Sequence, residues 1–147
     1  MIRIKTFRTI LILLSSVNLL NGQNLSMVNT LNSPFTRLSG VGLDDVKWTK
    51  GFWAERFSVC RDSMVTGMMK IYMDPEVSHS YRNFEIAAGM KQGEHQGPPF
   101  HDGDFYKLLE GLMMVYSTTR DTEIDQMIDK IISTISKSQR PDGYIHT

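Results

Sequence analysis

The stretch Phe100-His101-Asp102-Gly103-Asp104-Phe105-Tyr106-Lys107-Leu108-Leu109-Glu110-Gly111 places two carboxylates at the start of an amphipathic pattern. Acidic side chains are favoured in the first turn of a helix, where they accept free backbone N–H groups and interact well with the helix dipole. The apolar residues that follow recur at helical spacing: Phe105, Leu108, Leu109, Leu112 and Tyr116. The stretch therefore predicts a helix over about 104–118.

A second helical pattern follows the short connection 117–121. Its apolar residues keep the helical spacing throughout: Ile124, Met127, Ile128, Ile131, Ile132 and Ile135. Asp121 is placed to cap the start of this pattern, and Pro141 with Gly143 ends it. The sequence predicts a helix over 122–138, and the short connection implies an antiparallel hairpin with the helix before it.

A further helix is predicted over about 52–73. Its apolar residues are Phe57, Cys60, Met64, Met68 and Ile71, flanked by Val65, Met69 and Tyr72. Pro75 ends it, because the residue before a proline avoids helical angles. All three helices carry wide apolar faces. We therefore infer that apolar surface is left open for further partners, and that the chain is a piece of a larger fold.

The remaining segments have weaker patterns. Residues 24–42 are expected to form an N-terminal arm, and 41–48 a short strand or extended segment. The stretch 73–99 is rich in Gly and Pro, with a short helix predicted over 84–90. Within it, one set of residues is compatible either with the wall of a polar cleft or with an irregular surface loop. These are Tyr81, Asn83, Phe84, Gln92 and Gln96.

The N-terminus has the pattern of a secretory signal over residues 1–23. Arg3, Lys5 and Arg8 precede an apolar run that is shorter than the roughly 20 residues needed to span a bilayer. We expect export with cleavage near Gly22 or Gln23 to the periplasm or the outside of the cell, an uncleaved anchor being the alternative. After cleavage no membrane association is expected.

Charge and cysteine content restrict the function further. Lys plus Arg and Asp plus Glu both count 16, so neither nucleic acid nor an anionic membrane surface is suggested as a partner. Cys60 is the single cysteine, which excludes an internal disulfide and a multi-cysteine zinc site built from this chain alone. Its position on the apolar face of the 52–73 helix predicts a packing role.

Four blocks of sequence follow one another in a set order. They are Leu43-Asp44-Asp45-Val46-Lys47-Trp48 with Gly51-Phe52-Trp53, the 100–111 stretch, the 121–135 helix, and Ser138-Gln139 followed by Asp142-Gly143-Tyr144. In this order and spacing they resemble the N-terminal part of glycoside hydrolase family 127, the β-L-arabinofuranosidase type. The resemblance covers about 43–147. Gly103, Leu108 and Gly111 stand where the family usually has serine, tryptophan and alanine.

The resemblance implies an all-α fold, with 43–147 forming the first helical hairpins of a truncated (α/α)6 barrel. For full-length relatives it also implies a cysteine nucleophile near a zinc ion held by cysteine and glutamate, with a glutamate as acid/base. No position here matches those groups, so we expect no catalytic residue, metal ligand or cofactor in this chain. His95 and His101 are expected to lie at the surface rather than to bind metal with Glu94 or Asp102.

The candidate substrate-binding residues are Asp102, Asp104, His101 and Tyr144. Helix starts surround the mouth of such a barrel, so an aspartate at 102 or 104 is suited to accept hydroxyl hydrogen bonds from a sugar; capping its own helix is the alternative. Tyr144 is expected to shape the turn, with sugar stacking as a second possibility.

The function expected from the resemblance is that of part of an exported enzyme acting on arabinose-containing plant glycans, inactive by itself. The alternative is a small secreted helical module that binds a glycan or a protein without catalysis.

Overall fold

The computed structural model describes residues 26–28, 30 and 32–147, so the predicted signal peptide lies outside the described residues. The chain divides into two compact units, Met1–Gly42 and Leu43–Thr147, and each is treated by itself. In the first unit the described residues form turns and irregular backbone. None of the helices that the structure describes has the length and apolarity to cross a membrane.

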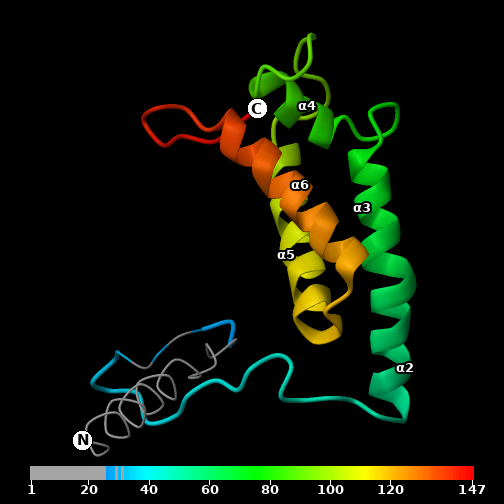
Figure 1. Cartoon of the computed structure of the whole chain (residues 1–147), viewed down its shortest axis with the longest axis vertical. Coiled ribbons are helices and arrows are strands. Elements are labelled where there is room, and N and C mark those ends of the chain that lie inside the picture. The colour runs from blue at the N-terminus through cyan, green and yellow to red at the C-terminus, as the bar shows by residue number, and fades with distance from the viewer. Residues whose placement is uncertain (1–25, 29, 31) are drawn as a thin grey trace, which may run out of the picture. The chain divides into compact units, whose positions relative to one another are not determined.

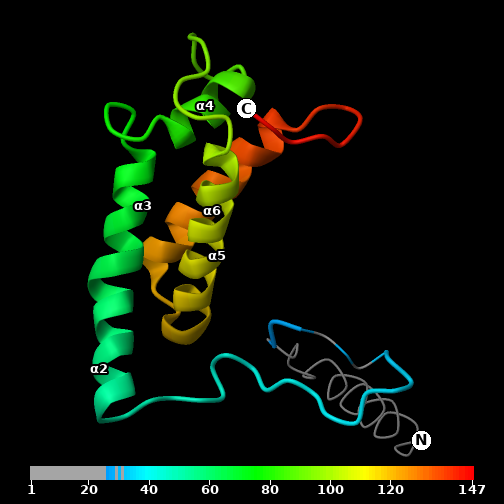
Figure 2. The same ribbon diagram turned by 180° about the vertical axis from the view of Figure 1, so that it is seen from behind.

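The second unit is helical. A long helix runs through α2 (Phe52–Val59), a π-helical segment η2 (Cys60–Val65) and α3 (Thr66–Met73). It is followed by α4 (Ser80–Ala87), α5 (His101–Thr119) and α6 (Thr122–Ser138). Figures 1 and 2 show α5 and α6 side by side and antiparallel, with α3 beside them and α4 at the end where α5 begins. The predicted all-α class is confirmed, since no strand occurs among the described residues.

Two helix predictions are confirmed at both ends. The long helix spans 52–73 and gives way to extended backbone at Asp74, just before Pro75. The last helix spans 122–138, and Asp121 caps it, because its Oδ1 accepts from the N–H groups of Glu123 at 2.8 Å and Ile124 at 3.2 Å. The connection turns at Arg120, which has left-handed backbone with φ 56°. The predicted hairpin of α5 and α6 follows from these features.

Three other predictions need correction. The helix expected over 104–118 already begins at His101 and ends at Thr119. The short helix expected over 84–90 lies instead over 80–87. It begins directly after His79, whose backbone is left-handed, and Gly89 with φ 68° follows its end. The strand considered for 41–48 is wrong: a turn occupies 43–45, where Asp44 pairs with the Arg120 guanidinium at 3.1 Å.

The core lies between α3, α4, α5 and α6. Its fully buried members are centred on Phe105, whose ring lies 5.6 Å from that of Phe84. Tyr81 contributes a buried polar contact, its hydroxyl lying 2.9 Å from the Thr134 hydroxyl on α6. The buried apolar residues are Met69, Tyr81, Phe84, Phe105, Leu109, Leu112, Val115, Ile124, Ile128 and Ile131. Tyr81 and Phe84, considered above as cleft residues, therefore belong to the core.

The long helix buries a different face from the one expected. Met69 is fully buried, whereas Met64, Met68 and Ile71 are each about half exposed, at 55%, 46% and 51%. The π-helical segment supplies the physical reason, because its wider turn rotates every later side chain relative to a regular α-helix. Cys60 lies in this segment and is half-buried rather than enclosed.

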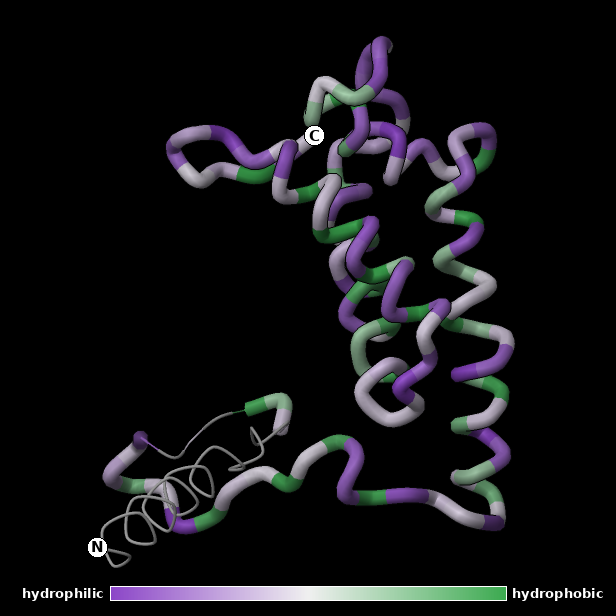
Figure 3. The backbone as a smooth tube through the Cα atoms, viewed as in Figure 1, coloured by the Kyte–Doolittle hydropathy of each residue, from purple (hydrophilic) through white to green (hydrophobic). Residues whose placement is uncertain are grey.

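The first turns of this helix carry apolar residues that no other described helix covers. Phe52 is 62% exposed and Trp53 is 65% exposed. Apart from its continuation into η2, α2 packs on none of the helices that the structure describes. The expectation of open apolar surface is thus confirmed at this end of the unit. Figure 3 shows the alternation of hydrophobic and hydrophilic residues along the long helix.

Candidate functional site

The candidate residues lie where α5 begins and α6 ends, next to α4 (Figure 1). Asp102 is the best connected of them. Its side chain is buried, and Oδ2 accepts from the Thr147 backbone N–H at 2.8 Å, while Oδ1 accepts from the Thr147 hydroxyl at 2.7 Å. His146 Nδ1 lies 3.6 Å from the same carboxylate. Asp102 thus joins the start of α5 to the segment after α6.

Asp102 was expected either to cap its helix or to bind a hydroxyl group. The helix N-cap is Phe100, which makes no side-chain capping bond, and the Asp102 oxygens accept from Thr147 rather than from the first turn of α5. The capping alternative is therefore wrong for Asp102. A ligand hydroxyl would have to share oxygens that already have partners.

Tyr144 lies on a turn that follows α6. The turn is closed by hydrogen bonds from the Arg140 N–H to the Tyr144 carbonyl at 2.9 Å and from the Gly143 N–H to the Arg140 carbonyl at 2.8 Å. Gly143 has φ 89°, which favours glycine. Asp142 accepts from the Tyr144 N–H at 3.1 Å, so the predicted role of these two residues in the turn is confirmed.

The Tyr144 ring is paired with a second ring. It lies parallel to the His146 ring, with 6.1 Å between centroids and 4° between planes, and the Arg140 guanidinium lies 5.9 Å from its centre. Tyr144 is 56% exposed. Because His146 also contacts Asp102, the structure brings Asp102 and Tyr144 into one cluster through His146.

His101, the first residue of α5, is half-buried. Its ring lies 6.2 Å from the Tyr72 ring, and a Cβ atom at Gly97 would come within 3.0 Å of its Nδ1. Among the described buried side chains, this Nδ1 is the polar atom without a hydrogen-bond partner. The expected surface position of His101 is therefore wrong, because the backbone at Gly97 covers it.

Asp104 lies apart from this cluster. Its Oδ1 accepts from the Lys107 ammonium at 3.1 Å on the surface of α5. Tyr106, on the same helix, responds to Asp102 alone of the two: burial raises its pKa, and the Asp102 carboxylate raises it further. The two aspartates thus have different environments, a difference that their positions in the sequence do not reveal.

A polar pocket of about 420 Å³ lies beside α4. Asn83 and Gln96 are at its wall, together with Gln92 and Glu94. Asn83 is buried, donates to the Gln96 carbonyl at 2.8 Å and accepts from the Gln96 N–H at 3.1 Å. Asn83, Gln92 and Gln96 thus line a polar pocket, while Gln92 and Gln96 also lie on irregular exposed backbone, so both interpretations describe part of this segment.

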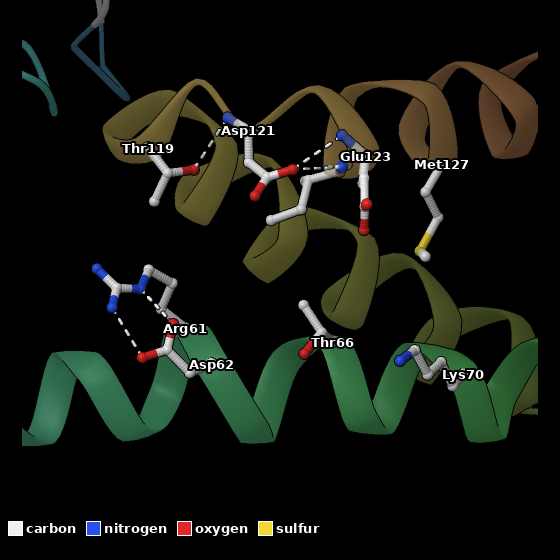
Figure 4. Close-up of a pocket in the computed structure, with 9 residues that line it drawn as sticks. Arg61, Asp62, Thr66, Lys70, Thr119, Asp121, Glu123 and Met127 are labelled. Carbon is white, nitrogen blue, oxygen red and sulfur yellow. Dashed lines mark hydrogen bonds and ion pairs between the residues drawn. The ribbon is translucent and has the colours of Figure 1, made fainter.

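A wider groove of about 540 Å³ runs between the long helix and the start of α6. Figure 4 shows Arg61, Asp62, Thr66 and Lys70 on one side, facing Asp121, Glu123 and Met127 on the other. Arg61 pairs with its neighbour Asp62 and lowers the pKa of that carboxyl through the hydrogen bond. Asp121 is occupied by capping α6. Three of the charged side chains that line this groove, Arg61, Asp62 and Asp121, thus already have structural partners.

The zinc site implied for full-length relatives does not fit the residues present. Within the part of the chain that the structure describes, no three His, Cys, Asp or Glu side chains come together in a group suited to hold a metal. Cys60, the only cysteine of the sequence, lies on the long helix rather than among the residues around Asp102. No chemical step can be assigned through zinc with these donors.

Two partners in this region had no signal in the sequence. His146 and Thr147 meet Asp102 across a large sequence separation, and neither follows a periodic pattern. The Asn83 contact with Gln96 joins a helix to a loop and is equally non-local. For the contact between Asn83 and Gln96, the one signal in the sequence was that both residues have amide side chains.

Comparison with known proteins agrees with this architecture. Residues 45–147 match the model of the "Beta-L-arabinofuranosidase, GH127 catalytic domain". A non-reducing end beta-L-arabinofuranosidase from Bifidobacterium longum subsp. longum is 29% identical, over 70% of this chain and 18% of the relative. The crystal structure of a GH127 beta-L-arabinofuranosidase from Geobacillus stearothermophilus T6 matches with a TM-score of 0.64 and 33% identity.

That structural match covers 69% of this chain and 16% of the solved chain. The chain thus spans less than a fifth of the length of either relative. GH127 enzymes have an (α/α)6 barrel, and the helical hairpins described above correspond to part of it. On the match over 45–147, this chain belongs to the GH127 β-L-arabinofuranosidase family.

Proposed function

We propose that this chain forms one section of the barrel of an exported glycoside hydrolase that releases β-L-arabinofuranosyl units from plant-type glycans. The family match over 45–147 carries this proposal. The basic and apolar pattern of residues 1–23 supports export to the periplasm or the cell exterior. Mass spectrometry of the secreted product, with a new N-terminus near Gly22 or Gln23, tests that part.

The contribution of this section is to shape and hold a sugar-facing wall. Glycosidases place an acid and a nucleophile or base on opposite sides of the bond that breaks. Asp102 is buried, and both of its oxygens accept from Thr147, so it is suited to hold the 144–147 segment rather than to attack a sugar. The exposed ring of Tyr144 then offers a face on which the apolar side of a sugar can stack.

The chain by itself is proposed to lack hydrolytic activity. Its only thiol, Cys60, is distant in the sequence from the residues around Asp102 and lies in a different helix. The 147-residue chain should therefore give no release of nitrophenol from p-nitrophenyl β-L-arabinofuranoside above a blank without protein. Clear turnover would refute the proposed inactivity.

A chimera tests the family function directly. Residues 45–147 replace the matching segment of the Bifidobacterium relative, and hydrolysis of the same aryl β-L-arabinofuranoside is measured. Activity above that of a chimera carrying Tyr144→Ala and Asp102→Ala together supports the proposal. A chimera that melts cooperatively but does not turn over the substrate contradicts it, and the α-L-arabinofuranoside serves as the specificity control.

A further inference from the structure

The pocket beside α4, defined above by Asn83, Gln92, Glu94 and Gln96, has a fixed framework. Asn83 is 1% exposed and makes a two-way hydrogen-bonded pair with the backbone of Gln96. At Gly93, with φ 147°, a Cβ atom would lie 3.1 Å from Ile86 Cδ1, so the loop backbone lies against α4. The loop that forms part of the pocket wall is therefore held against α4 at two points.

The pocket lining also includes a residue with left-handed backbone. His79 precedes α4 with φ 61° and is not a glycine, and it lines the pocket. Such left-handed backbone is unfavourable for residues other than glycine and is concentrated at binding and catalytic sites. His79 thus lines the same cavity as Gln92, Glu94 and Gln96 of the loop.

The side chains around the cavity have unused hydrogen-bonding capacity. Within the described residues, the side chains of Gln92, Glu94 and Gln96 make no hydrogen bond or ion pair. An amide offers both donors and acceptors, whereas a carboxylate only accepts. Together these groups are suited to neighbouring hydroxyl groups, each of which donates and accepts.

The charges around the cavity select against ionic ligands. Glu76 and Glu94 line it with negative charge, which disfavours a phosphate or another anion. Arg82 is also in the lining, 3.6 Å from Glu85, and it disfavours a cation. Among the described lining residues the one aromatic residue is His79, so a nucleobase would have a stacking partner on one side at most. An uncharged ligand rich in hydroxyl groups remains.

We propose that this pocket binds one uncharged saccharide unit of the glycan, apart from the Asp102–Tyr144 cluster. The volume of about 420 Å³ lies within the range of about 300–1,000 Å³ typical of small-ligand pockets. The choice of a sugar rests on the proposed function, while the preference for a neutral polyol rests on the lining itself. The loop that contributes Gln92 and Glu94 is mainly hydrophilic (Figure 3).

The test is an NMR titration of the ¹⁵N-labelled 147-residue chain with methyl β-L-arabinofuranoside. The side-chain amide signals of Gln92 and Gln96 should shift and saturate. The double variant Gln92→Ala/Glu94→Ala should weaken binding about tenfold, as expected for the loss of two hydrogen bonds. Both side chains are exposed, so the variant should fold. The matched control is Gln126→Ala/Glu110→Ala, two exposed helix positions outside the pocket, with unchanged affinity expected.

Inorganic phosphate is the charged comparison and should cause no saturable shift. The proposal is overturned if the sugar causes none, if both double variants lose affinity equally, or if phosphate binds at the same signals. If the chimera hydrolyses its substrate while the titration fails, only this proposal is lost. If the titration succeeds while the folded chimera is inactive, sugar binding in the pocket is supported and the proposed hydrolase function is contradicted.

Discussion

Asp102, in the first turn of α5, holds Thr147 by two hydrogen bonds, one to its backbone N–H at 2.8 Å and one to its hydroxyl at 2.7 Å. The carboxylate is 5% exposed. A buried carboxylate is costly unless it has partners, and Thr147 provides two of them. This contact determines where the segment carrying Tyr144 and His146 lies relative to α5.

Replacing Asp102 by alanine should lower the free energy of unfolding by about 1–3 kcal/mol, because the Thr147 donors lose a buried acceptor. Asp104→Ala is the matched control, since Asp104 makes a surface pair with Lys107 worth less than about 0.5 kcal/mol. Urea unfolding followed by circular dichroism compares the two. Equal effects at both positions would show that the Asp102 contact does not stabilise the fold.

Capping of α6 by Asp121 gives a second stability prediction. Its Oδ1 accepts from two N–H groups of the first turn, and loss of such a cap costs about 1 kcal/mol. Asp121→Ala should therefore lower the urea midpoint, whereas Asp129→Ala, at an exposed position within the same helix, should change it little. If the two variants have the same midpoint, the cap contributes nothing measurable.

The Asn83 contact predicts a local effect. Asn83→Ala removes both hydrogen bonds to the backbone of Gln96, so the loop loses its attachment to α4. Amide hydrogen exchange at Gln96 should become faster by about tenfold, corresponding to about 1.4 kcal/mol of lost protection. Gln92→Ala, in the same loop, should leave that rate unchanged. An unaltered rate in Asn83→Ala would mean that other contacts hold the loop.

The sequence predicted those helix ends that depend on local chemistry. The proline at 75 and the carboxylate at 121 act within one turn of the chain, so the C-terminal end of α3 and the start of α6 were predicted correctly. The start of α4 was not, because it depends on left-handed backbone at His79, and a single histidine does not by itself predict that conformation. The buried face of the long helix was also predicted wrongly, because it depends on the π-helical segment and the spacing of the apolar residues does not indicate one.

The candidate site was predictable only as a set of residue types. Asp102 and Tyr144 were named separately as candidates, and the sequence did not indicate that they lie in one region. The link between them passes through His146, which contacts both. Such pairs carry no periodic signal. The same is true of the Gly97 backbone over His101, which a lone glycine in a loop does not reveal.

Tyr106 gives a prediction in alkaline solution. Burial raises the pKa of this phenol from its ordinary value of 10.0, and the Asp102 carboxylate raises it further. The folded state therefore binds the phenolic proton more tightly than the unfolded state. Its contribution to stability is complete below about pH 10 and is lost as the pH rises through the higher folded pKa. Tyr106→Phe should remove this component, so the stability of the wild type should fall more steeply above about pH 10 than that of the variant. Parallel slopes in urea unfolding between pH 9 and 11 would contradict the assignment.

The exposed apolar residues at the start of the long helix give a test between the two functional interpretations, a section of a barrel and a self-sufficient secreted module. Phe52 and Trp53 are exposed side by side, and large apolar side chains in contact with water bind hydrophobic dyes. The chain should enhance the fluorescence of anilinonaphthalene sulfonate, and Phe52→Ser/Trp53→Ser should reduce the enhancement at unchanged urea midpoint, because serine has a similar helix propensity. Glu55→Ser on the same helix is the control and should keep the full signal. A chain that melts cooperatively and binds no dye would favour the alternative of a self-sufficient secreted module, since a barrel section awaiting neighbouring helices must leave this surface open.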